Sequence, residues 1–181
     1  MLTRRSRPFT SLMVLVLVAG ACVGCSATAG PEDPGLGDES RAPLEVPAAP
    51  VLTDPPSAVG SYTDWVSYAY LVMDARVAED AISAYEEVRV SAYIERNRSE
   101  QGRGIHQVLI QSDYELASQE ETSAVVTGVE TWIYRYFDAE TRDYTSDVLE
   151  ASYDVTYTVI VEEPKGWVVD RVEATPRGEV E

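Results

Sequence analysis

The stretch that decides the fold is YDVTYTVIVEEPKGWVVDRVEA, residues 153–174. Aromatic and aliphatic side chains take every second position of its first half, and aspartate and threonine take the positions between them. Alternation with a period of two places one set on each face of a strand. The face predicted to be apolar consists of Tyr153, Val155, Tyr157, Val159 and Val161. The turn at EEPKG then predicts a hairpin, and a single apolar face indicates an antiparallel sheet covered on one side.

Two more segments upstream have the composition of strands. VLIQSDYELAS (residues 108–118) and SAVVTGVETWIYRYFDAE (residues 123–140) are rich in Val, Thr, Ile and Tyr, the residues that strands favour. From Gln107 onward the apolar residues recur with a period of two, and Gly102 and Gly104 mark the end of the helical half before them. We therefore expect about four antiparallel strands in the C-terminal half.

The preceding half has helical spacing. Residues 61–80 begin with Ser61 and Asp64, which resemble a capping box. Residues 78–100 continue the helical pattern without Gly or Pro, so we expect a break near residues 76–80 rather than one very long helix. The predicted apolar side of the second helix consists of Ile82, Tyr85, Val88 and Ala92.

Together these elements predict an α+β domain at residues 61–175, with N-terminal helices packed on one side of a curved antiparallel sheet of about four strands. An acidic tail, residues 176–181, follows it. A domain of this size can bury one modest core.

Residues 1–25 predict a leader. Arg4, Arg5 and Arg7 form a basic start, and LMVLVLVAGACVGC follows, too short an apolar run to span a membrane comfortably. The sequence VAGAC before Cys22 resembles the lipobox of bacterial lipoproteins, in which the cysteine is lipidated; Cys25 is the alternative attachment site. An ordinary cleaved signal, or a redox pair of these cysteines, would also fit the spacing.

Residues 26–60 are rich in Pro, Gly, Ala and acidic side chains, and they predict a disordered tether. The chain carries 14 basic and 31 acidic residues, a net charge of −17, which becomes −20 without the three leader arginines. This charge argues against nucleic acid and anionic headgroups as partners. The predicted membrane contact is therefore the lipid anchor, on the extracytoplasmic face of a bacterial cell membrane.

The strands AVVTGVETWIY, YDVTYTVIV and GWVVDRV resemble the intermembrane-space domain of plastid-division proteins of the ARC-six type and their bacterial relatives, within the nuclear transport factor two-like, cone-shaped fold. The resemblance covers the last strands and not the helical half, and the J-like, repeat and transmembrane regions of those proteins are missing. It implies a non-catalytic domain outside a membrane that contacts partners. The matching residues are Ala124, Val126, Glu130, Tyr153, Tyr157, Gly166, Trp167 and Val169.

The composition limits the possible chemistry. His106 is the single histidine, so we expect no metal site. The sequence has no Gly-rich phosphate loop, and we expect no cofactor. It also lacks the nucleophile elbow of serine hydrolases. Glu130 is the one weak catalytic candidate, because a carboxyl group in an apolar cone can act as an acid or base. The alternative is a Glu130 that faces solvent or pairs with Arg135 or Arg171.

The predicted function is a lipid-anchored envelope module that binds a protein or a small apolar ligand. A cone-fold isomerase or dehydratase and a purely structural envelope module remain as alternatives. The candidate pocket or contact residues are Tyr134, Tyr153, Tyr157 and Trp167.

Overall fold

The computed structural model describes residues 41–178. The predicted leader, its cysteines and residues 26–40 therefore lie outside the described residues. The elements are α1 (Pro55–Val72), the short 3-10 helix η1 (Ala75–Ala78), α2 (Ala84–Gln101), β1 (Arg103–Gln119), β2 (Ser123–Asp138), β3 (Leu149–Glu162) and β4 (Gly166–Pro176).

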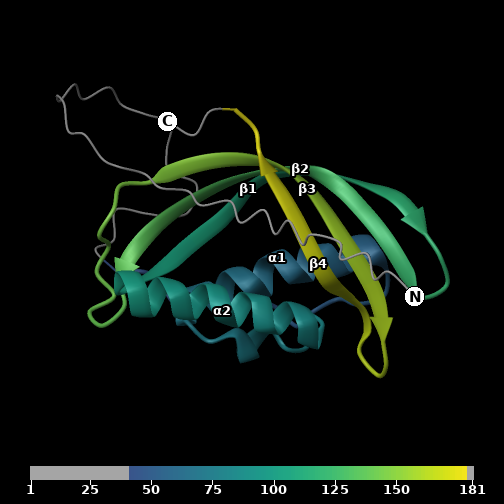
Figure 1. Cartoon of the computed structure of the whole chain (residues 1–181), viewed down its shortest axis with the longest axis horizontal. Coiled ribbons are helices and arrows are strands. Elements are labelled where there is room, and N and C mark those ends of the chain that lie inside the picture. The colour runs from purple at the N-terminus through teal and green to yellow at the C-terminus, as the bar shows by residue number, and fades with distance from the viewer. Residues whose placement is uncertain (1–40, 179–181) are drawn as a thin grey trace, which may run out of the picture. The chain divides into compact units, whose positions relative to one another are not determined.

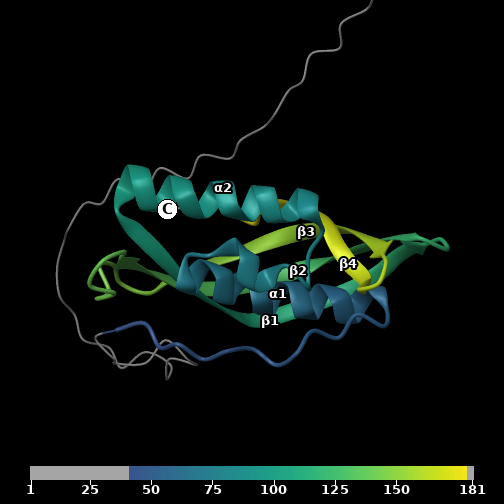
Figure 2. The ribbon, with the colours of Figure 1, turned by 90° about the horizontal axis from the view of Figure 1, so that it is seen from below.

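The four strands form one antiparallel sheet in the order β1-β2-β3-β4. The sheet arches over the helices, and both α1 and α2 lie on its concave side (Figure 1). Seen from below, α1 runs close to β1, and α2 lies on the other side of α1 (Figure 2). The predicted α+β fold, with helices on one face of a curved four-stranded sheet, is confirmed.

Alternation along the strands explains how the core forms. Val155, Tyr157 and Val159 of β3 are buried, as the sequence predicts, and their partners on β2 include Val126 and Ala124, which are buried too. The helices cover this face with buried residues that include Ala58, Val59, Tyr62, Val66, Ala69, Val90 and Ile94.

Helix α1 begins earlier than predicted. The side chain of Asp54 caps it by accepting a hydrogen bond from the backbone N–H of Ser57 at 3.0 Å, and Pro55 takes the first helical position, where a missing N–H costs nothing. The predicted capping box at Ser61 and Asp64 is wrong. Ser61 lies buried inside the helix, where its hydroxyl accepts from Val51 N–H at 2.8 Å, and Asp64 is exposed.

The expected break between the two helices is present. Helix α1 ends at Val72, and α2 begins at Ala84 after η1. Of the predicted apolar side of the second helix, Ile82 is 0% exposed but precedes α2. The other three positions were predicted wrongly, because Tyr85 and Val88 are 52% and 68% exposed and Ala92 is exposed as well. The inward side of α2 consists of Glu86, Val90, Ile94 and Asn97, two of them polar.

Residues 41–54 run back along α1 in an extended form (Figure 2). Arg41 pairs with Asp143 at 3.1 Å, Trp65 Nε1 donates to the carbonyl of Ala48 at 2.9 Å, and the N–H of Trp167 donates to the carbonyl of Leu52 at 3.0 Å. Residues 41–60 thus pack on the domain, which begins upstream of the expected boundary at Ser61.

Candidate functional site

The carboxyl group of Glu130 lies under the sheet and is 3% exposed. Its Oε1 accepts hydrogen bonds from the hydroxyls of Tyr114, at 2.6 Å, and Tyr157, and its Oε2 accepts one from Trp132 Nε1 at 2.7 Å. All three donors are uncharged. A buried carboxylate with three donors is well satisfied without a cation.

The strand register brings these side chains together. Glu130 and Trp132 are two residues apart on β2 and so share its concave face. Tyr114 on β1 lies opposite Gly128 of β2. A Cβ at Gly128 would lie 2.7 Å from the Tyr114 ring and 2.4 Å from the carbonyl oxygen of Asp113. Glycine at this position therefore lets the tyrosine ring cross β2 toward the carboxylate.

The two tyrosines are held in the protonated form. Burial raises the pKa of Tyr157, and the adjacent charge of Glu130 raises it further. Burial also raises the pKa of Tyr114, with its hydrogen bond to Glu130 as the next cause. Both hydroxyls therefore remain donors to Glu130 throughout the neutral pH range, an arrangement that holds a carboxylate in place rather than moving protons.

The geometry does not favour catalysis at Glu130. An acid or base needs access to a substrate, but the rings of Tyr114 and Tyr157 pack edge to face over the carboxylate with centroids 6.1 Å apart. The alternative interpretation, in which Glu130 faces solvent, is wrong, because Glu130 is 3% exposed. The Arg135 guanidinium lies over the Tyr144 ring, and that of Arg171 lies over Tyr85.

A second buried carboxylate was missed by the sequence analysis. Glu86 on α2 accepts from the Tyr62 hydroxyl at 3.0 Å and from Arg89 Nη1 at 2.9 Å. Burial raises its pKa, and the charge of Arg89 opposes this. The rings of Tyr62 and Tyr157 meet edge to face at 5.6 Å, which joins the two carboxylate clusters.

The sequence did carry a signal for Glu86. Ser83 and Glu86 have capping-box spacing, and Ser83 is indeed the N-cap of α2, accepting from Glu86 N–H at 3.2 Å. The Glu86 side chain does not complete the box, because the Ser83 N–H donates to the carbonyl of Val169 instead. The carboxylate is thus available to Tyr62 and Arg89 in the interior.

Four partly exposed tyrosines form what we call the aromatic patch: Tyr93 of α2, Tyr134 and Tyr136 of β2, and Tyr153 of β3. The rings of Tyr134 and Tyr136 pack edge to face at 5.8 Å, and the guanidinium of Arg103 lies 3.5 Å above the Tyr136 ring. Burial, followed by the effect of the other three tyrosines, raises the pKa of Tyr134 to about 12. Burial also raises the pKa of Tyr93 and of Tyr153, so the patch combines apolar area with at least three neutral hydroxyls.

The four predicted contact residues fall in three places. Tyr134 and Tyr153 belong to the aromatic patch. Tyr157 is 1% exposed and is a core residue, so it cannot form a contact surface. Trp167 is partly buried at the start of β4, where it packs against the main core cluster.

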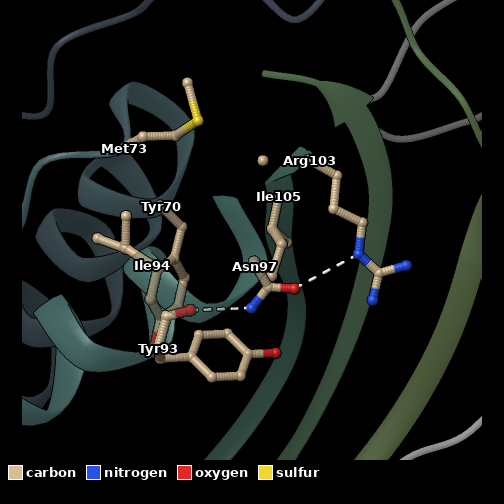
Figure 3. A pocket seen from close by; sticks show the side chains of 8 residues that line it. Tyr70, Met73, Tyr93, Ile94, Asn97, Arg103 and Ile105 are labelled. Carbon is tan, nitrogen blue, oxygen red and sulfur yellow. Dashed lines mark hydrogen bonds between the residues drawn. The ribbon is translucent and has the colours of Figure 1, made fainter. Parts of the chain in front are cut away.

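A hollow lies beside the aromatic patch, between the end of α1, α2 and the start of β1 (Figure 3). The hollow is shallow and has room for about one water molecule. Asn97 Nδ2 donates to the carbonyl of Tyr93 at 3.0 Å, and Arg103 Nε donates to Asn97 Oδ1 at 3.4 Å. The lining residues are Tyr70, Met73, Tyr93, Ile94, Asn97, Arg103, Gly104 and Ile105.

The remaining titratable groups suggest no other site. His106 is buried, with Nδ1 2.6 Å from the Tyr144 hydroxyl and its ring stacked on that tyrosine. Within residues 41–178, no group of three or more His, Cys, Asp or Glu side chains could hold a metal ion. None of the helices in this range is long and apolar enough to cross a membrane.

No model of a known protein family matches the chain, and no curated protein sequence matches it. Among solved structures, it is similar to the intermembrane space region of the chloroplast protein ARC6, with a TM-score of 0.48 and 14% identity over 69% of this chain and 98% of the other. It is similar to a periplasmic fragment of TraM, with a TM-score of 0.45 and 9% identity over 68% and 96% of the two chains. It is also similar to a domain of unknown function with a cystatin-like fold from Nostoc punctiforme, with a TM-score of 0.41 and 10% identity over 70% and 79%. The resemblance to an intermembrane-space domain predicted from the sequence is thus found among the solved structures. Similarities at this level of identity do not bear on function.

Proposed function

We propose that the protein is a lipid-anchored, extracytoplasmic binding module that contacts its partner or ligand through the aromatic patch. The observation that carries the proposal is the grouping of four tyrosines that remain accessible at one end of the concave face. Tyr93 is 45% exposed and Tyr134, Tyr136 and Tyr153 are partly exposed, whereas Tyr157 beside Glu130 is 1% exposed. Partly exposed tyrosines offer large, rigid contact area with a polar tip.

The anchoring part of the proposal rests on the leader sequence, in which small residues precede Cys22. Metabolic labelling with a fatty-acid analogue tests it. The wild-type chain and Cys25→Ala should label and fractionate with membranes, and Cys22→Ala should do neither. Labelling of Cys22→Ala but not of Cys25→Ala would move the anchor to Cys25, and an unlabelled wild type would refute the anchor.

Site-specific cross-linking in the producing cell tests the contact surface. A photoreactive residue replaces Tyr134 or Tyr153 in the patch, and Glu173 on the opposite face of the sheet serves as the control, because it is exposed and pairs with Thr156. We expect one defined cross-linked species from both patch positions and none from the control. Equal products from all three positions, or none from the patch, would contradict the assignment and favour a purely structural module.

A further inference from the structure

We propose that the exposed proline-rich segment of residues 43–51 docks on the aromatic patch of a second copy of this chain. The proposal deepens the proposed function, on which it rests, by naming the partner that the patch contacts.

Residues 43–51 form an exposed apolar stretch. Leu44, Val46 and Val51 are 59%, 61% and 53% exposed, and among residues 41–178 they are three of the nine large hydrophobic side chains that are exposed. Single hydrophobic residues scattered over a surface need no explanation, whereas a group of them marks a contact site. The segment therefore has the composition of a binding surface.

The backbone of this segment has a form that aromatic surfaces recognise. Pro43, Pro47 and Pro50 have φ fixed at about −65°, and the residue before each proline is restricted to extended backbone. No residue from 42 to 52 belongs to a helix or strand. These features favour the polyproline II conformation, which docks in grooves lined by aromatic side chains.

One edge of the segment is already packed on the domain. A polyproline II helix has three residues per turn. Pro47 and Pro50 therefore share an edge, and they are the two partly buried residues of the segment. Trp65 Nε1 of α1 donates to the carbonyl of Ala48 at 2.9 Å. Because an ordered segment loses less freedom on binding than a free one, the exposed edges are preorganised for a partner.

The aromatic patch complements the segment in chemistry and in charge. Its accessible rings offer flat apolar surface to prolines and aliphatic side chains. Arg103, stacked on Tyr136, forms no ion pair with a carboxylate of residues 41–178. Glu45 is exposed and is the one charged residue of the segment. A second copy therefore brings a carboxylate for Arg103 together with prolines for the rings.

The expected contact is weak and depends on local concentration. At about 3.1 Å per residue the segment is roughly 28 Å long, and a strip of this length is smaller than the roughly 1,200 Å² that stable complexes bury. The net charge of −17 opposes association, although salt screens charges beyond about 8 Å. The proposed lipid anchor holds the copies at one membrane, which raises their local concentration.

Site-specific cross-linking of the full-length chain in the producing cell tests the contact. A photoreactive residue replaces Leu44 or Tyr134, and two differently tagged copies are expressed together to separate contacts between copies from contacts within one. We expect both positions to give a product that carries both tags. Leu44 should join a peptide of the aromatic patch, and Tyr134 should join the peptide that contains residues 43–51. Glu173, on the opposite face of the sheet, should give no such product.

Substitutions in the segment test its apolar side chains. Leu44→Ser combined with Val46→Ser should lower the yield of the Tyr134 product about tenfold, because two apolar side chains are no longer buried in the contact. Val88→Ser, which changes an apolar side chain 68% exposed on α2, is the matched control and should leave the yield unchanged. All three positions are exposed, so the melting temperatures should stay within a few degrees of the wild type.

A charge exchange tests the pairing of Glu45 with Arg103. Glu45→Arg in one copy should lower the yield of the product with both tags, because two cations then meet. Arg103→Glu in the other copy should restore that yield, which a merely structural effect of either change would not do.

The proposal is overturned if neither position gives a product with both tags, if the Tyr134 product maps outside residues 43–51, or if the variant at Leu44 and Val46 cross-links as well as the wild type. A Tyr134 product with a different protein alone would show that the second copy is the wrong partner and that the contact surface stands. If Tyr134 and Tyr153 give no product at all, the proposed function falls with it.

Discussion

Glu130 shows how a charged side chain is accommodated in the core of a small domain. Its two oxygens accept from two phenol hydroxyls and one indole N–H; the ring of Tyr157 lies in the core and that of Tyr114 packs against it. The rings thus supply apolar burial and hydrogen bonds from the same side chains. Removing the charge of Glu130 alone should therefore lower the free energy of unfolding.

We predict that Glu130→Gln lowers the free energy of unfolding by about 2–3 kcal/mol, because an amide NH₂ group would meet donors where an oxygen now accepts. Urea denaturation at pH 7 measures the loss. Glu173→Gln, on the exposed face of β4, is the matched control and should change stability by less than about 0.5 kcal/mol. A neutral effect at Glu130 would contradict a stabilising role for its hydrogen bonds to Tyr114, Tyr157 and Trp132.

We also predict a tyrosine-dependent loss of stability at high pH. Burial is the first cause of the raised pKa of both Tyr62 and Tyr157. The unfolded chain releases these protons above pH ~10 while the folded chain keeps them, so the free energy of unfolding falls by about 1.4 kcal/mol per pH unit for each. The stabilising contribution is therefore complete below pH ~10 and is lost above it.

Urea midpoints between pH 8 and 11 test this dependence. Above pH ~10, Tyr157→Phe should remove the contribution of one tyrosine to the fall in the free energy of unfolding. The same change also lowers stability at pH 7, because Glu130 loses one hydrogen-bond donor. Tyr85→Phe, at an exposed position of α2, should leave the slope unchanged. Equal slopes for wild type and Tyr157→Phe would place the Tyr157 hydroxyl in contact with water.

At the residue scale, the sequence identified Glu130 but not its surroundings. A glutamate in the middle of an apolar strand is conspicuous, whereas its partners come from positions 16 and 27 residues away along the chain. Only the strand register brings them together. Alternation places Tyr157 on the apolar face but does not show how deeply the helices cover that face, so it leaves core, pocket and contact roles open for this residue.

Among the elements, the strands were predictable and the helices only in part. Period-two alternation is strong on a sheet with one covered face, and β3 follows it closely. Helical periodicity of apolar residues does not predict the inward face of α2. That face includes Glu86 and Asn97, and the outward face includes Tyr85 and Val88. Each inward polar group has one partner within α2, Arg89 for Glu86 and the carbonyl of Tyr93 for Asn97. The second partners, Tyr62 and Arg103, lie outside α2, and its own sequence does not reveal them.

Strand β2 depends on the missing side chain of Gly128, which gives a prediction for this element. Gly128→Ala should cost about 1–3 kcal/mol, because the new Cβ would lie 2.4 Å from a backbone oxygen that cannot move without its strand. Gly60→Ala in α1 is the matched control: nothing lies within 4 Å of its Cβ, and the change should stabilise the helix by about 0.5–1 kcal/mol. Thermal melts of both variants should shift in opposite directions.

At the scale of the whole molecule, the limits of the domain were the least predictable feature. Pro, Gly and acidic residues upstream of Ser61 have the composition of a tether, yet Asp54 and Pro55 start a helix and the residues before them pack against it. Composition describes an average over many residues, and a single cap decides where the helix begins.

Truncation tests this boundary. A chain of residues 41–181 should melt cooperatively, with a midpoint close to that of the full chain. A chain of residues 61–181 should be unstable, because it lacks the cap and the first turns of α1, including Ala58 and Val59, both 0% exposed. Equal melting of the two chains would show that residues 41–60 contribute little.

The extended segment 41–54 also determines how the domain responds to mechanical force. Its attachments join Arg41 to Asp143 between β2 and β3, Ala48 to Trp65 of α1, and Leu52 to Trp167 of β4. They follow one another along the segment, so a pull on the N-terminal side loads them in turn rather than together. The first combines an exposed ion pair between Arg41 and Asp143 with a β-bridge between the same residues, and Ala42 beside it is buried. In single-molecule pulling from that side, we expect a low-force extension of about 50 Å as the segment peels away, before the sheet ruptures. A single rupture with no earlier step would contradict this, and chains beginning at Asp54 should lose the early step alone.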